Sequence, residues 1–292
     1  MAPESTFKTS FRDDAALLRW YLDMGVDEAI GEVPVDRFAL SAEQKARAQA
    51  PKPAAPSREQ QGFFPAVQDR PRTRPALPPG DGLNPDEAVA DARSLAAKAD
   101  SIDALYEALQ GFEGCPLKKT AKNLVLSDGN PAARVMLIGE APGADEDRQG
   151  KPFVGRSGQL LDKILSAIGL DRHAEDPERS AFISNTIFWR PPGNRKPTAA
   201  ETEICLPFIL RAIELVDPRL IVCLGATPMQ RLCNTTDGIL RSRGKWKSYH
   251  LGGRDVPLMP TLHPAYLLRQ PAQKALCWRD MLEVRKRMDE FG

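Results

Sequence analysis

Three side chains of types that serve acid–base or electrostatic catalysis each follow an apolar run. Glu140 comes after the run 135–138 and Gly139, Asn185 lies near the end of the run 181–187, and His263 follows the run 256–261. A carboxylate, an amide and an imidazole together can stabilise separated charges, donate hydrogen bonds and position water. These residue types indicate an enzyme that works by acid–base or electrostatic catalysis.

The segment 139–158 is a turn-rich stretch with a packed acidic group, Asp145, Glu146 and Asp147. An acidic loop that faces water is one interpretation. A metal-dependent hydrolase that uses Asp145, Asp147 and His263 is another, although no HExxH or other His-rich spacing supports zinc. A Walker loop and a GxSxG nucleophile elbow are absent. Phe153 lies between Pro152 and Val154. An apolar ring is unusual in a polar loop, so a structural or functional role is expected for it.

The elements that would position these residues are strands alternating with helices. We predict an α/β fold of three α/β/α layers with a central four-stranded parallel sheet. Ligands bind beyond the carboxyl ends of such strands, so Glu140, Asn185 and His263 would meet at one edge. The expected strands are 135–138, 181–187, 220–224 and 256–261, and the expected helices begin near Asn84, Ser101, Leu160, Thr198 and Gln273.

Composition divides the 292 residues into three parts. Residues 1–40 would form a short helical extension, and residues 41–85, which hold nine of the 26 prolines, a flexible linker. Residues 86–292 would form the main domain. The five cysteines show no CxxC spacing, and no stretch is long enough to span a membrane. We therefore expect a cytoplasmic protein, and at a net charge of +1 any contact with nucleic acid requires a local basic patch.

Three long motifs carry a resemblance to a known family. They are GEAPGADEDRQGKPFVGRSG at 139–158, NTIFWRPPGNRKP at 185–197 and TLHPAYLLRQP at 261–271. In order and spacing they resemble the uracil-DNA glycosylase superfamily, and family 4 in particular, from about residue 112 to 280. The resemblance implies a parallel sheet flanked by helices. It also implies an enzyme that flips a damaged base out of DNA and hydrolyses the N-glycosidic bond, leaving an abasic site.

The same resemblance implies roles for the candidate residues. Glu140 and Glu146 would be the acidic groups that favour the positive charge of the sugar, and His263 would hydrogen-bond the oxyanion of the departing uracil. Asn185 would match the donor–acceptor edge of uracil, and Phe153 would stack on the flipped base. Each of these residues also has a purely structural alternative. The residues that would surround the base are Gly139, Ala141, Gly143, Phe153 and Asn185.

The resemblance also implies residues that contact DNA. Leu267 and Leu268 would wedge into the stack that the base leaves. For the cationic side chains, an ordinary surface charge is the alternative to a phosphate contact. These cationic candidates are Lys151, Arg190, Arg195 and Arg269.

The chain departs from family patterns at the pocket and at the metal site. Ala141 and Gly143 stand where the most uracil-specific relatives have Asp and Tyr, which predicts a roomier pocket that accepts other deaminated bases. Family 4 enzymes carry a 4Fe-4S cluster on four cysteines, and this chain keeps Cys115 and Cys205 but has Phe112 and Trp189 at the other two positions. We expect no cofactor, with a retained 4Fe-4S cluster as the alternative.

The expected partner is uracil-containing DNA, bound by a monomer without membrane association. A second protein could bind the N-terminal extension. A non-catalytic or trapping uracil-DNA-binding protein is the alternative to an enzyme. One branch of the superfamily that holds DNA in this way has a basic insertion after the first motif, and only KPFVGRS stands between Gly150 and Gly158 here.

Overall fold

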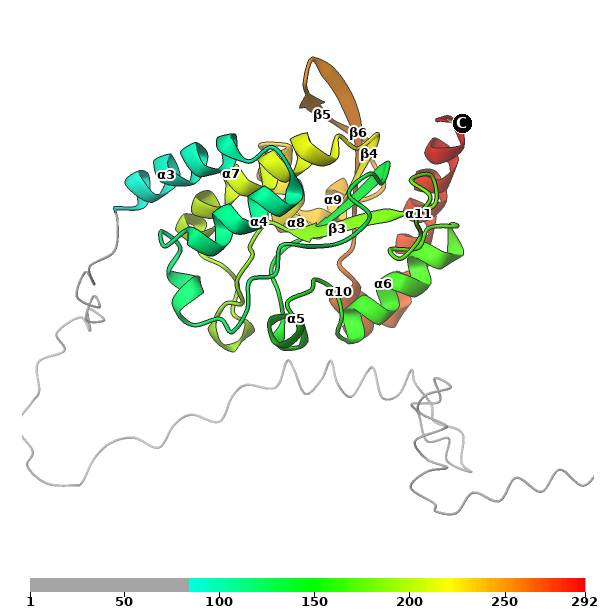
Figure 1. Ribbon diagram of the computed structural model, residues 1–292. Coiled ribbons are helices and arrows are strands. Elements are labelled where there is room, and N and C mark those ends of the chain that lie inside the picture. Colours follow the sequence, from blue (N-terminus) through cyan, green and yellow to red (C-terminus); the bar gives the residue numbers. More distant parts are fainter. Residues whose placement is uncertain (1–83, 292) are drawn as a thin grey trace, which may run out of the picture. The chain divides into compact units, whose positions relative to one another are not determined.

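The computed structural model describes residues 84–291. The expected N-terminal extension and almost all of the expected linker lie outside the described residues. The described part forms a twisted sheet covered on both faces by helices (Figure 1). No helix within it is long and apolar enough to cross a membrane.

The sheet has six strands in the order β1-β3-β2-β4-β6-β5. The four central strands are parallel, as predicted, and each edge of the sheet carries an antiparallel strand that was not predicted. Both edge strands were missed because their residues are polar or half-buried, so no apolar run marks them. The strands are β1 (Ser127–Gly129), β2 (Val135–Gly139), β3 (Ala181–Asn185), β4 (Leu220–Leu224), β5 (Lys247–Leu251) and β6 (Arg254–Thr261).

The helices begin where the capping residues predict. Asn84 and Thr198 each cap a helix in a reciprocal capping box, with Glu87 and Glu201 as the returning side chains. The helices are α3 (Pro85–Lys98), α4 (Ile102–Gly111), α5 (Ala144–Gln149), α6 (Arg156–Ala167), α7 (Ala199–Val216), α8 (Ala226–Leu232), α9 (Ile239–Ser242), α10 (Pro264–Arg269) and α11 (Lys274–Asp289). Three short 3₁₀ turns complete the set: η1 (Pro116–Lys119), η2 (Pro192–Asn194) and η3 (Pro271–Gln273).

The central strands are buried on both faces, which gives the domain two cores. Met136 and Ile138 of β2 point into the core under α3, α4 and α7. Val135 and Leu137 alternate with them and point into the core under α6 and α11. The predicted three-layer α/β/α architecture is therefore confirmed, and the layers are visible in Figure 1.

Candidate active site

A pocket of about 680 Å³ opens at the carboxyl ends of the parallel strands. Strand ends and the segments that follow them supply much of its wall: Glu140 after β2, Asn185 at the end of β3, Gly225 after β4 and His263 after β6. The three side chains that sequence analysis placed at one sheet edge therefore line one pocket. Ala141, Gly143 and Phe153 line it as well.

Asn185 lines this pocket and has an unused hydrogen-bonding group. Its side chain is buried, and Oδ1 has no hydrogen-bond partner. A buried acceptor without a partner is costly, about 1–3 kcal/mol, so it usually marks a ligand or a functional strain. Gly139 faces it across the strand pair, and a Cβ on Gly139 would overlap both Asn185 Oδ1 and the Phe153 ring. Gly139 thus keeps open the space into which Asn185 points.

Phe153 presents its ring to the same space from a strained backbone. Its φ is 54°, in the left-handed region, which costs a bulky residue of order 1–3 kcal/mol. The ring lies 5.5 Å from the His263 ring, centroid to centroid, with 32° between the two planes. Such strain persists only where the surrounding structure imposes it, so the loop holds Phe153 in this place against its own preference.

His263 is held in one tautomer by the start of α10. Its Nδ1 accepts a hydrogen bond of 3.1 Å from the backbone N–H of Ala265, so Nδ1 carries no proton. Nε2 therefore carries the proton of the neutral ring and acts as a donor. Burial lowers the pKa of His263 to about 4, with a further contribution from the positive charge of Arg269. The ring stays neutral at physiological pH.

This lowered pKa predicts how stability depends on pH. Between pH 6.5 and about 4 the unfolded chain protonates His263 and the folded chain does not, so acid costs the wild type stability. In His263→Gln this contribution is gone. We expect the melting temperature of the wild type to fall several degrees further than that of the variant between pH 7 and pH 5. Thermal unfolding at both pH values measures this, and equal losses would contradict it.

Glu140 is the carboxylate that faces the pocket with an oxygen to spare. Its Oε2 accepts a hydrogen bond of 2.5 Å from the Thr227 hydroxyl at the start of α8. Its Oε1 accepts none from the described residues, and the residue is only half-buried. A carboxylate held by one oxygen and open at the other can orient a water molecule or face a developing cation.

The acidic group that follows is largely used to fold the loop. Both oxygens of Glu146 accept backbone N–H groups: Oε2 that of Gly143 at 3.1 Å, and Oε1 those of Val154 at 3.1 Å and Gly155 at 2.9 Å. Asp147 is buried and accepts the N–H groups of Lys122 and Asn123. Asp145 pairs with Arg148. Within residues 84–291 no three His, Cys, Asp or Glu side chains form a group that could hold a metal ion.

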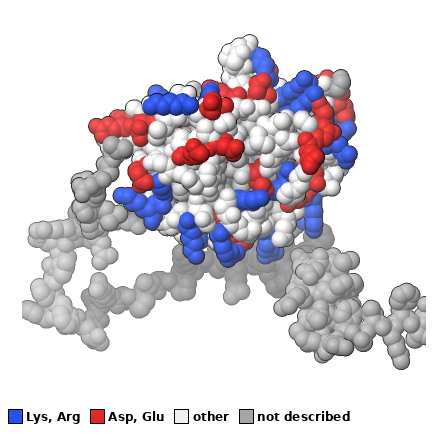
Figure 2. Space-filling view, in the orientation of Figure 1, with Lys and Arg blue, Asp and Glu red and all other residues white. Residues whose placement is uncertain are grey.

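Two of the predicted DNA-binding side chains, Arg195 and Arg269, line the pocket. Lys and Arg gather along one edge of the domain in Figure 2, the edge at which α5 lies in Figure 1. Arg269 forms no ion pair with any described residue. Arg195 pairs with Glu201 at 2.5 Å. Leu268 is 37% exposed, but Leu267 is buried in the core under α6 and α11.

The remaining two cationic candidates each have a partner. Arg190 donates to Asn194 Oδ1 at 2.7 Å. Lys151 lies 3.3 Å from Asp128 and keeps more than half of its side chain exposed. Both can still turn a charged end toward a phosphate, because such surface contacts contribute little to stability.

Cys115 and Cys205, the two cysteines that match cluster positions of family 4, lie together in the core under α3, α4 and α7. Cys115 Sγ and Cys205 Sγ are 3.9 Å apart, both residues are fully buried, and all five cysteines are free. The hydrogen bond with Cys115 and the complete burial raise the pKa of the Cys205 thiol. Phe112 and Trp189 are buried in the same core, and the Phe112 ring packs edge-on against Phe208. The residues at this place supply two ligands, so a four-thiolate cluster does not fit them.

Sequence reasoning missed three residues of the site. Thr227 binds Glu140, and its position just after the end of β4 was a usable signal because strand ends meet at this edge. Leu240 of α9 is 64% exposed at the pocket, and Arg172 lies behind the Phe153 loop. No local pattern marks these last two.

Comparison with known proteins agrees with this geometry. Residues 126–282 match the model of the family described as the uracil DNA glycosylase superfamily. The match covers more than half of the chain, so the chain belongs to this superfamily, and the residues that line the pocket at the sheet edge lie within the matched range.

Proteins similar to the chain include several type-4 uracil-DNA glycosylases. The one from Pyrobaculum aerophilum is 37% identical over 184 residues, which cover 62% of this chain and 91% of the relative. Those from Archaeoglobus fulgidus and Thermotoga maritima are 39% and 38% identical, each over 59% of this chain and 85% of the relative. Within the superfamily the chain resembles these type-4 enzymes.

Proposed function

We propose that the chain is a DNA-repair enzyme that flips uracil out of DNA and hydrolyses its N-glycosidic bond, leaving an abasic site. The observation that carries this proposal is Asn185, which lines the pocket together with the aromatic ring of Phe153 and whose buried Oδ1 has no hydrogen-bond partner among the described residues. Uracil presents an N–H donor at N3 and a carbonyl acceptor next to it, which an amide matches with its own acceptor and donor. The names of the type-4 relatives support the same substrate.

The groups around the pocket fit the charges of this reaction. Cleavage leaves positive charge on the sugar and negative charge on the base. His263 donates from Nε2 to the developing oxyanion without a proton transfer, because its ring is already neutral. Glu140 faces the sugar and orients the attacking water through its free oxygen. Glu146, whose oxygens are both occupied, shapes the loop instead.

DNA contacts are proposed for Leu268 and for four cationic side chains. Leu268 rather than Leu267 would enter the base stack, because Leu268 is exposed and Leu267 is buried in the core. Arg269 makes no ion pair with any described residue and is the first candidate for a phosphate, followed by Lys151, Arg190 and Arg195.

An excision assay tests the proposal. The protein is incubated with a uracil-containing oligonucleotide in parallel reactions with and without EDTA, and abasic sites are then cleaved with alkali. Strand breaks that require His263 and Asn185 support a metal-free glycosylase. Tight binding without breaks would favour the trapping protein, and breaks lost only in EDTA would favour a metal-dependent hydrolase.

A wider range of bases is proposed on the same geometry. Gly143 places no ring against the base, and a Cβ there would lie 2.7 Å from Glu146 Oε2. Oligonucleotides with other deaminated bases extend the assay. Excision of uracil alone by the wild type would remove this part of the proposal.

The absence of an iron–sulfur cluster is a further testable part of the proposal. Phe112 and Trp189 would take up the space of two ligands as apolar packing. We expect protein purified without oxygen to contain less than about 0.1 iron per chain and to lack absorbance near 400 nm. Iron near four atoms per chain would contradict this. As a control, Cys205→Ala should then retain excision activity, since no cluster depends on the thiol.

A further inference from the structure

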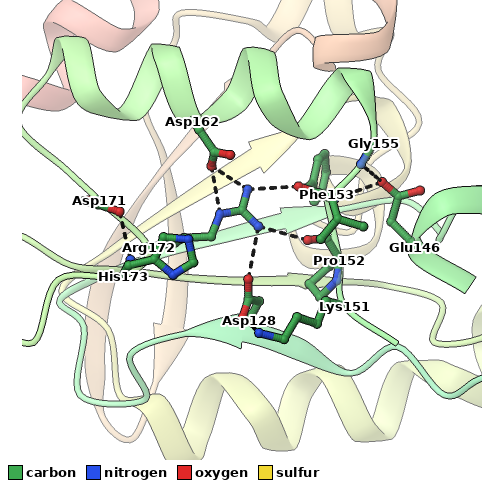
Figure 3. Close-up of polar contacts among 11 residues, drawn as sticks. Asp128, Glu146, Lys151, Pro152, Phe153, Gly155, Asp162, Asp171, Arg172 and His173 are labelled. Carbon is green, nitrogen blue, oxygen red and sulfur yellow. Dashed lines mark hydrogen bonds and ion pairs between the residues drawn. The ribbon is translucent and has the colours of Figure 1, made fainter. Parts of the chain in front are cut away.

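Arg172 lies beside the Phe153 loop, residues 150–155 between α5 and α6. Its guanidinium donates hydrogen bonds to two carbonyls of this loop and to two carboxylates (Figure 3). Nη1 donates to the Pro152 carbonyl and Nη2 to the Phe153 carbonyl, each at 3.0 Å. Nε donates to Asp162 of α6 at 2.8 Å, Nη2 also reaches Asp162, and Nη1 also reaches Asp128 of β1 at 3.3 Å. These contacts use the five N–H donors that an arginine has.

The Arg172 side chain is buried and its own backbone is fixed. Asp171 accepts the His173 N–H at 2.9 Å in an Asx turn, and the Asp171 N–H donates to the Arg179 carbonyl at 2.8 Å. The turn therefore holds the start of the side chain, while Asp128 and Asp162 balance its charge. A buried arginine with these contacts is held in one conformation before any substrate binds.

Two side chains of opposite charge bind successive backbone groups of the loop. Arg172 takes the carbonyls of residues 152 and 153, and Glu146 takes the N–H groups of residues 154 and 155. Gly158 of α6 lies against the same peptide, where a Cβ would overlap the Phe153 carbonyl. These contacts surround Phe153, the one non-glycine residue between α5 and α6 with a positive φ.

We propose that Arg172 is a positioning residue for catalysis, which holds Phe153 in its left-handed conformation so that the ring stacks on the flipped base. The inference rests on the proposed excision of a base, and it assigns Arg172 no contact with that base. Neither a lysine nor a glutamine can replace it fully. Lysine has a single charged centre and cannot reach two successive carbonyls and two carboxylates in one plane.

Amide hydrogen exchange tests the positioning itself. In Arg172→Gln and Arg172→Lys the N–H groups of Val154 and Gly155 should exchange about tenfold faster than in the wild type, while β2 and β4 keep their protection. Arg211→Gln is the matched control, because Arg211 also donates to a backbone carbonyl, that of Ala99, but lies away from the pocket. Unchanged exchange in a folded Arg172→Lys would overturn the proposal.

Excision kinetics test whether positioning serves the reaction. We expect Arg172→Gln to lower kcat about 100-fold and to change KM less than about threefold, because DNA binding rests on other residues. Arg172→Lys should recover part of kcat. A loss confined to KM, or full activity in Arg172→Gln, would contradict the proposal.

A double-mutant cycle decides whether Arg172 acts through Phe153. In a Phe153→Ala background, Arg172→Gln should lower kcat less than about twofold further, since the ring it positions is gone. Losses that multiply would show that Arg172 acts elsewhere. If the wild type excises no base, the proposed function fails, whereas the exchange measurement still tests the hold on the loop.

Discussion

Replacing His263 with alanine is expected to lower kcat for uracil excision about 100- to 1000-fold. The reason is the loss of a pre-oriented neutral donor. The bond from the Ala265 N–H to Nδ1 places the proton on Nε2, and burial keeps the ring uncharged down to about pH 4. A donor that is already in place stabilises the departing anion without reorganisation at the moment of reaction.

Two variants separate this role from the structural role of the same residue. His263 is also the N-cap of α10, so alanine removes a cap worth about 1 kcal/mol. His263→Asn keeps a capping side chain, but asparagine is too short to donate a hydrogen bond to the departing base as the imidazole does. We expect His263→Asn to be as inactive as His263→Ala but more stable. Recovery of activity together with the cap would show that His263 acts only through α10.

The matched control is His250→Ala. His250 lies exposed on β5 and pairs only with Asp255, so its loss should leave kcat unchanged. The donor also predicts a pH profile, because the contribution of His263 should stay constant from pH 8 to pH 5. Single-turnover rates across that range provide the measurement, and a rate that falls through pH 6.5 would contradict a neutral donor.

The sequence predicts the central fold because local signals agree with the tertiary structure. The run of Val135 to Ile138 is buried on both faces, and the cap at Thr198 starts α7 where the capping box requires. The edge strands have no such signal. β1 is three residues, Ser127–Gly129, and forms only because β3 lies beside it. Its pairing is a property of the assembled sheet.

The site is predictable in its place but not in all of its roles. Strand ends bring Glu140, Asn185 and His263 to one pocket, as the topology of a parallel sheet requires. The difference between Glu140 and Glu146 depends on which backbone N–H groups lie nearby, and those come from residues 143, 154 and 155. The role of Arg172 is harder still to predict from sequence. Its partners extend from Asp128 to Asp162, and only the folded chain brings them together.

Asn185→Ala is expected to lower kcat/KM for uracil about 100- to 1000-fold, since the edge of the flipped base would lose both of its partners. The same change should leave the free protein as stable as the wild type or more so. Asn185 Oδ1 is buried without a partner, so removing it relieves a desolvation cost instead of breaking a bond. Activity and stability would then change in opposite directions, which is the mark of a group kept for its ligand.

Asn130→Ala provides the contrast. Asn130 Nδ2 donates to the Glu175 carbonyl at 2.8 Å, and its Oδ1 accepts the Ala132 N–H at 2.9 Å, both away from the pocket. Its loss should cost about 1 kcal/mol of stability and no activity. Excision rates and urea unfolding of the two variants decide the matter. If Asn185→Ala unfolds as readily as Asn130→Ala, Oδ1 has a partner in the folded protein and its role as a base reader loses its physical basis.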